Sequence, residues 1–101
     1  MTTPAFNFVA EKCRKYIHHL PDYMRQGMMD YIMEGVRPGH FLQAVISNNL
    51  KEACHYADDT NQHRLFDYIL FLHNAAPMNA WGSKKHMESW IMVKGARGKL
   101  L

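Results

Sequence analysis

The sequence predicts an all-α protein, a compact single domain of five or six short helices. Apolar residues recur at steps of three and four over most of residues 6–92, the spacing of one helix face. No stretch alternates between apolar and polar residues for long enough to require a sheet. The length of 101 residues is that of one domain, since typical domains have about 100–150 residues. We expect residues 1–93 to form the helical domain and residues 94–101 a flexible basic tail.

The first helix is predicted from Pro4 to about His19. Pro21 cannot continue a helix interior but suits a first helical position, so a second helix starts there and ends at Gly35, a C-terminal cap. The apolar residues of the first helix share one face of a 3.6-residue period: Phe6, Val9, Cys13, Tyr16, Ile17 and Leu20. Both helices are therefore expected to pack through one apolar side.

Turn residues divide the middle of the chain. The Arg37-Pro38-Gly39 turn starts a third helix whose apolar block ends at Asn48-Asn49, and residues 50–56 continue in helical register. Residues 58–61 offer several N-caps for the next helix, which ends at His73-Asn74. These signals predict three helices between residues 39 and 74.

The last predicted helix starts after Ser83, which can cap it, and extends through Met92. Gly95 and Gly98, together with Lys94 and Lys99, predict an unstructured tail. The net charge of +3 is unevenly distributed, because residues 82–101 hold five basic side chains and one acidic one. Such a basic end is most often a solvated, frayed terminus, and otherwise it favours phosphates or an acidic protein face as partners.

Composition indicates a cytoplasmic protein with no membrane partner. No apolar run approaches the roughly 18 residues that a membrane-spanning helix needs, and the N-terminus lacks the basic start and apolar block of a leader. Cys13 and Cys54 lie inside helical patterns, so we interpret both as reduced core thiols.

The sequence contains no catalytic or metal-binding motif, so we predict no enzyme, no metal and no cofactor. His55, Asp59 and His63 are spaced by four residues, which suits ligands on one helix line, but the helix boundary predicted at residues 58–61 breaks that line. No GxSxG or comparable nucleophile signature occurs. A small hydrolase that uses His and Asp residues remains the third of the functions considered.

The junction from Trp81 to Lys85 is a candidate anion site. Lys84 and Lys85 lie in a first helical turn, where they oppose the positive end of the helix dipole and an anion would compensate them. The hydroxyl of Ser83 could donate to that anion, and the indole of Trp81 could stack on a base. In the structural alternative, Trp81 packs into the core, Ser83 caps the helix and both lysines point into water.

Arg37, Gly39 and His40 form a second basic helix start, where Gly39 permits close approach of a phosphate. The alternative is an ordinary turn. If the two basic helix starts lay near each other, or faced each other across a dimer, they would form one composite anion pocket.

Methionines on the second helix suggest a partner interface. Met29 and Met33 fall off the main apolar stripe, and flexible thioethers suit adaptable surfaces, although methionine also serves as core filler. Together with the 48% hydrophobic composition of so short a chain, they predict a homo-oligomer.

A set of segments between about Leu20 and Ile91 forms one pattern: Leu20-Pro21-Asp22-Tyr23-Met24-Arg25 with Tyr31-Ile32, Arg37-Pro38-Gly39-His40-Phe41-Leu42 with Ala44-Val45, Asn48-Asn49-Leu50-Lys51-Glu52-Ala53, Ala57-Asp58, and Ala76-Pro77 with Trp81-Gly82-Ser83 and Trp90-Ile91. This pattern resembles a widespread group of small, uncharacterised phage and prophage proteins. The resemblance implies a phage setting, hence the cytoplasm of a bacterial host.

These observations favour a non-enzymatic, phage-type binding protein that inhibits or sequesters a host component. Its partner would be a host defence protein or a phosphorylated small-molecule ligand such as a nucleotide immune signal. The alternative is a small nucleic-acid-binding module that uses the basic C-terminal region, although no helix-turn-helix or aromatic-basic RNA motif occurs.

Overall fold

A computed structural model describes residues 2–101. These residues form eight α-helices, six of them with seven or more residues, two short 3₁₀ helices and no strand. The all-α prediction is confirmed. The number of helices is larger than the predicted five or six, because two short helices were not predicted. The elements are α1 Pro4–Tyr16, η1 Ile17–His19, α2 Asp22–Glu34, α3 His40–Ile46, α4 Leu50–Tyr56, α5 Asp59–His63, α6 Leu65–Ala75, η2 Met78–Ala80, α7 Lys84–Met92 and α8 Gly95–Leu100.

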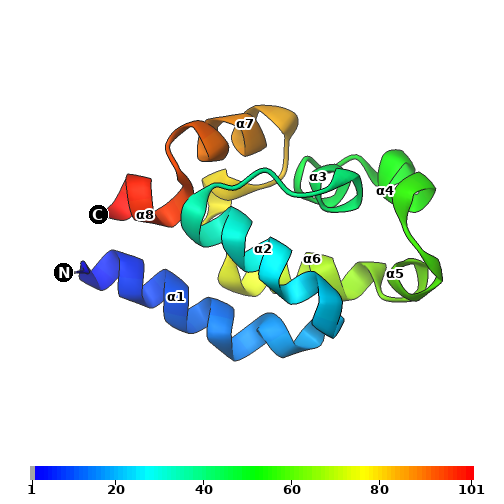
Figure 1. Cartoon of the computed structure of the whole chain (residues 1–101), viewed down its shortest axis with the longest axis horizontal. Coiled ribbons are helices and arrows are strands. Elements are labelled where there is room, and N and C mark those ends of the chain that lie inside the picture. The colour runs from blue at the N-terminus through cyan, green and yellow to red at the C-terminus, as the bar shows by residue number, and fades with distance from the viewer. Residues whose placement is uncertain (1) are drawn as a thin grey trace.

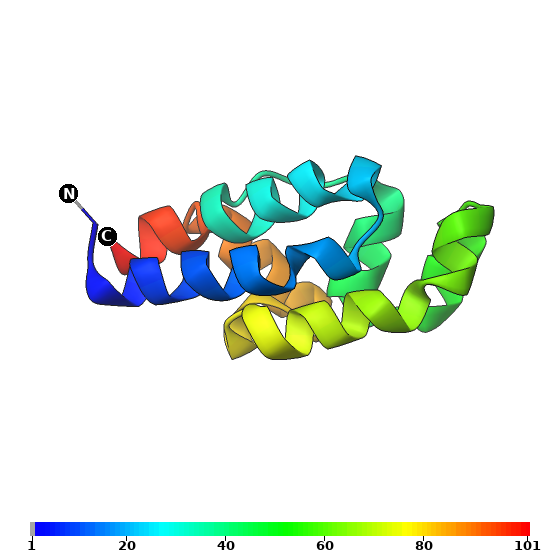
Figure 2. The same cartoon turned by 90° about the horizontal axis from the view of Figure 1, so that it is seen from below.

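The three longest helices, α1, α2 and α6, run along the long axis of the molecule (Figures 1 and 2). The shorter α3, α4 and α7 lie on one side of them. The core is one cluster to which nearly every element contributes, and its largest fully buried side chains are Tyr31, Tyr68, Phe71, Leu20, Met28, Ile32, Ile46, Leu72 and Cys13. Burial of apolar surface by an all-helical shell therefore holds the fold together.

Local caps fix several helix ends, and the caps at Gly35 and Ser83 lie where they were predicted. Thr3 Oγ1 accepts a hydrogen bond from the Phe6 amide, with Pro4 as the first helical residue of α1. Gly35 has a φ of 68° and donates its amide to the Tyr31 carbonyl, which ends α2 as predicted. The start at Ser83 is likewise confirmed, because its Oγ accepts from the His86 amide.

A separate short helix, α5, interrupts the predicted run from residue 58 to residue 74. Asp58 caps it through the Asn61 amide, and Arg64 ends it with a φ of −114° before α6 begins. The sequence offered several caps here but no stop signal at Arg64, so one helix was expected where the chain makes two.

The C-terminal segment is a packed helix, which corrects the prediction of a flexible tail over residues 94–101. Gly95 and Ala96 are buried where α8 packs on α2, and Arg97 forms an ion pair with Glu34 at 2.7 Å. Thr3 Oγ1 also donates to the Leu100 carbonyl at 2.6 Å, so the two ends of the chain lie side by side (Figure 1). The glycines that suggested disorder permit close packing instead.

Two further side-chain predictions need correction or remain open. Cys13 is fully buried, and burial raises its pKa to about 12, whereas Cys54 is exposed on α4 and is not a core thiol. Both thiols are free.

Met29 and Met33 are half-buried against the core, and the more exposed apolar side chains lie elsewhere, Phe66 on α6 among them. Homo-oligomerisation stays a prediction.

Candidate functional site

A polar cleft of about 280 Å³ opens between α3, α4 and α7, on the side of the molecule where Figure 1 shows these helices together. Its lining is mostly polar and comes from all three helices and the turn between α3 and α4: His40, Gln43, Ala44, Ser47, Asn49, Glu52, Tyr56, Lys84 and Met87. Small-molecule sites usually measure about 300–1,000 Å³, so the cleft is slightly smaller than that range.

The helical period places one polar stripe of α3 in the cleft. His40, Gln43 and Ser47 are spaced by three, four and seven residues, so they share a face, while the opposite face of α3 is buried. Asn49 then caps α4 by accepting the Glu52 amide, which fixes where α4 starts beside α3.

Glu52 and Tyr56 form the α4 wall, because residues four apart lie one above the other on a helix. The Tyr56 ring stacks on the His40 imidazole, with 5.1 Å between ring centroids and 21° between planes. The cleft thus has an aromatic wall that joins α3 to α4.

Long-range hydrogen bonds hold α7 and the segment before it against α3 and α2. The Gly82 amide donates to the Ile46 carbonyl at 2.8 Å, which ties the segment before α7 to the last residue of α3. The buried Trp90 indole donates to the Ile32 carbonyl at 3.0 Å, and the Tyr31 hydroxyl donates to the Ala80 carbonyl. Lys84 is consequently placed by buried contacts although its own side chain is exposed.

The polar groups of the cleft divide into held and free ones. Gln43 is held, since its amide donates to the Pro38 carbonyl and its oxygen accepts from Arg37. The Ser47 hydroxyl donates to the Ala44 carbonyl. Among residues 2–101, no side chain bonds to the Lys84 ammonium, the Glu52 carboxylate or the Tyr56 hydroxyl. These free groups are the ones that a ligand could engage.

Two of the seven predicted ligand residues, His40 and Lys84, line the cleft together. The composite pocket considered from the sequence therefore has a geometric counterpart within one chain. Arg37 does not line it, because its guanidinium binds the Glu88 carboxylate through two hydrogen bonds of 2.8 and 2.5 Å. This pairing raises the pKa of Arg37 and lowers the pKa of Glu88.

The other four predicted residues have structural places. Trp81 is half-buried against the core, and Ser83 caps α7, as in the structural alternative. Lys85 is exposed and absent from the cleft lining, and Gly39 has a φ of −66°, which any residue adopts. None of these four residues lines the cleft.

Sequence reasoning missed the polar face of α3 because it described this helix by its apolar block alone. The spacing of His40, Gln43 and Ser47 carried a usable signal, a polar stripe at helical period on an otherwise apolar helix. The contribution of Glu52 and Tyr56 could not be found this way, since it depends on how α4 folds back onto α3.

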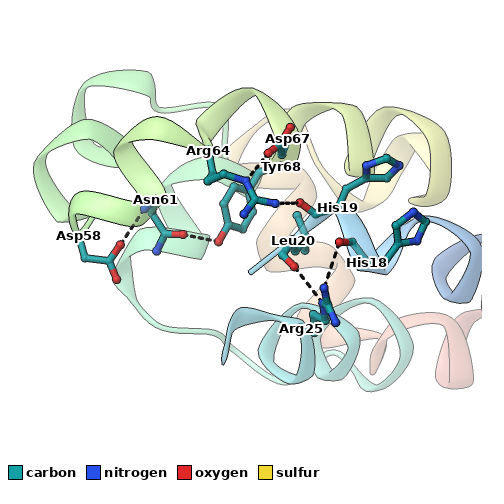
Figure 3. Close-up of polar contacts among 9 residues, drawn as sticks. All are labelled: His18, His19, Leu20, Arg25, Asp58, Asn61, Arg64, Asp67 and Tyr68. Atoms are coloured by element: carbon teal, nitrogen blue, oxygen red, sulfur yellow. Dashed lines mark hydrogen bonds and ion pairs between the residues drawn. The ribbon is translucent and has the colours of Figure 1, made fainter. Parts of the chain in front are cut away.

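A second polar cluster joins α5 and α6 to the end of η1 (Figure 3). Arg25 donates to the carbonyls of His18 and Leu20, and Arg64 donates to the carbonyl of His19 and pairs with Asp67. The arginines therefore cap carbonyls at the end of the first helical segment, where the helix dipole favours cations. In the same view, the buried amide of Asn61 accepts from the Tyr68 hydroxyl. This cluster is structural.

Acid should weaken the Asp58 contact of that cluster. Hydrogen bonds from the Tyr23 hydroxyl and the Asn61 amide lower the pKa of Asp58. A lowered folded pKa contributes stability above the unfolded value of about 3.9, and this stability is lost as pH falls through the folded pKa. We expect Asp58→Asn, which keeps a cap, to be less stable than the wild type at neutral pH and equally stable near pH 2. Urea unfolding at both pH values measures the difference, and a gap independent of pH would contradict the expectation.

The described part of the chain contains no group of three or more His, Cys, Asp or Glu side chains that could hold a metal ion. The helix boundary at Ala57 and Asp58 separates His55 from His63. No helix within residues 2–101 combines the length and apolar character needed to cross a membrane.

Comparisons with protein-family models, curated proteins and solved structures return no match.

Proposed function

We propose that the protein is a non-enzymatic, phage-type binding protein that takes up a small phosphorylated ligand in the cleft between α3, α4 and α7. By holding this ligand, the protein would withhold a nucleotide signal from the bacterial host. The phage setting rests on the sequence resemblance alone. One observation carries the choice of ligand: His40 and Lys84, which begin two helices far apart in the sequence, line the same cleft.

The chemistry of the cleft suits a mononucleotide. The Lys84 ammonium supplies a point charge for a phosphate, and an imidazole N–H of His40 can donate to the same group. The stacked rings of Tyr56 and His40 offer an aromatic face for a planar base. A volume of about 280 Å³ favours one nucleotide over an oligonucleotide.

The alternative of a nucleic-acid-binding module is less well supported by the C-terminal region. Arg97, one of its basic residues, is paired with Glu34, while Lys94 and Lys99 are exposed. A binder of this kind would lose affinity steeply with salt and would depend on Lys94 and Lys99.

Replacement of Lys84 by alanine tests the proposal, with Lys85→Ala as the matched control. The two lysines are adjacent in the first turn of α7, and only Lys84 lines the cleft. Because a hydrogen bond to a charged group contributes about 1.5–3 kcal/mol, we expect Lys84→Ala to weaken nucleotide binding about ten- to hundredfold. Lys85→Ala should bind like the wild type.

The measurement is isothermal titration with a panel of linear and cyclic mononucleotides, after a thermal-shift screen of the same panel. Circular dichroism of both variants checks that the fold is kept. Absence of binding across the panel would overturn the proposal. Equal losses in the two variants, together with a steep salt dependence, would point to nucleic acid instead.

A further inference from the structure

The cleft is zwitterionic. Lys84 lies on its α7 side, and the Glu52 carboxylate lies on its α4 side without a hydrogen-bond or ion-pair partner among residues 2–101. A bare phosphate that fills the cleft would therefore meet a like charge. The ligand must instead combine an anionic group for Lys84 with hydrogen-bond donors for Glu52.

The helical register places Glu52 beside the aromatic wall. Glu52 and Tyr56 are separated by four residues on α4, a spacing that sets Cβ atoms about 5–6 Å apart on one face. The Tyr56 ring is fixed in turn by its stacking on His40. A planar base stacked on this wall would have the Glu52 carboxylate on the α4 side of the cleft as an acceptor for its edge, and Lys84 on the α7 side for its phosphate.

Base edges differ in the donors that they offer to a carboxylate. Guanine presents N1–H and the 2-amino group side by side, which matches the two oxygens of one carboxylate in a bidentate pair. Adenine presents the 6-amino group beside the N1 acceptor, and this lone pair faces a carboxylate oxygen unfavourably. Hypoxanthine keeps N1–H and lacks the 2-amino group.

We infer that the cleft selects a guanine nucleotide, with Glu52 as the residue that determines base specificity through the N1–H and 2-amino donors. The inference rests on the proposed function, since it concerns the same cleft. Other carboxylates do not compete for this role, because Glu88 is bound by Arg37 and none of the remaining ones lines the cleft.

Titration of the wild type with guanosine, inosine and adenosine monophosphates tests the inference. We expect the guanine nucleotide to bind at least about tenfold more tightly than the adenine one, with the inosine nucleotide between them, because each lost charge-assisted hydrogen bond weakens binding by about that factor. Glu52→Gln should reduce the preference for guanine to within about threefold, because the glutamine amide weakens guanine binding and can pair with the 6-amino group and N1 of adenine, so adenosine monophosphate should bind somewhat more tightly than to the wild type. Its matched control is Glu11→Gln, an exposed carboxylate on α1 away from the cleft.

The outcomes separate the inference from the proposed function. Equal affinities for the guanine and adenine nucleotides, with Lys84→Ala still weakening both, would overturn the guanine inference and keep the cleft as a phosphate site. Retention of the full guanine preference by Glu52→Gln would also overturn the inference. No binding of any of the three nucleotides would overturn both, and thermal unfolding of each variant shows whether the fold is intact.

Discussion

Replacing Gly95 by alanine is expected to lower the free energy of unfolding by about 3 kcal/mol or more, because two independent costs add. Gly95 has a φ of 66°, where a side chain is strained. A methyl group on its Cα would also lie 2.5 Å from the Gly35 amide nitrogen and 2.9 Å from the Ile32 carbonyl oxygen. Both are backbone atoms of α2 or its cap and cannot turn aside as a flexible side chain would.

Gly35→Ala, at the other glycine of this contact, should lower the free energy of unfolding by a similar amount. Gly35 has a φ of 68°, and its added methyl would lie 2.6 Å from the Gly95 nitrogen. The end of α2 and the start of α8 therefore cross in backbone contact that only a pair of glycines permits.

Gly27→Ala provides the matched control. Gly27 lies inside α2, and its added methyl would make an ordinary 3.6 Å contact with Leu42 Cδ1. Removing a helix-interior glycine should raise stability by about 0.5–1 kcal/mol. Urea unfolding followed by circular dichroism measures all three variants. A Gly95→Ala protein as stable as the wild type would mean that α8 does not pack on α2 as described.

Local chemistry is what the sequence predicts well. The predicted helix start at Pro4, the end at Gly35 and the start after Ser83 follow from side chains or φ preferences that act within one helical turn, so a single sequence contains the whole cause. The apolar faces of α1 and α2 are visible for the same reason, since periodicity is also local.

The packed C-terminal helix could not be predicted in this way. Gly95 and Gly98 look like helix breakers within their own segment. The role of Gly95 becomes visible only when α2 lies against it, while Gly98 lies close to the backbone of Val93. The ion pair between Glu34 and Arg97 joins α2 to α8 in the same contact, and local sequence patterns could not predict it either. Tertiary contact thus overrides intrinsic helix preference here.

The candidate site falls between these cases. The two basic helix starts were found from the sequence, and one residue from each of them, His40 and Lys84, lines the same cleft. The sequence analysis assigned Arg37 to a ligand because its true partner could not be seen. Arg37 pairs with Glu88 on a different helix, and an ion pair between distant segments leaves no local pattern in the sequence. Glu52, on which base selection depends in our inference, looked like an ordinary first-turn acid of α4.

Trp90→Ala is expected to cost about 3–5 kcal/mol of stability, the range for removal of a large buried aromatic side chain. Trp90 is 2% exposed, so the substitution would leave a cavity between α7 and α2. It would also leave the Ile32 carbonyl without the indole N–H that donates to it at 3.0 Å. Since total stabilities are about 5–15 kcal/mol, the variant would retain only part of its folded population under mild denaturant.

Two further variants isolate the cause. Trp90→Phe keeps most of the ring but lacks the donor, so it should lose less than Trp90→Ala and report the cost of the unpaired carbonyl, about 1–3 kcal/mol, together with a small cavity. Trp81→Phe is the control, because Trp81 is half-buried and its indole makes no hydrogen bond within residues 2–101. It should cost less than about 1.5 kcal/mol, as a shape-conserving change at a partly exposed position does. Denaturant unfolding followed by circular dichroism ranks the three variants. If Trp81→Phe proved as costly as Trp90→Ala, the anchor that holds α7 and its Lys84 beside α3 would be Trp81 rather than the bond from Trp90 to α2.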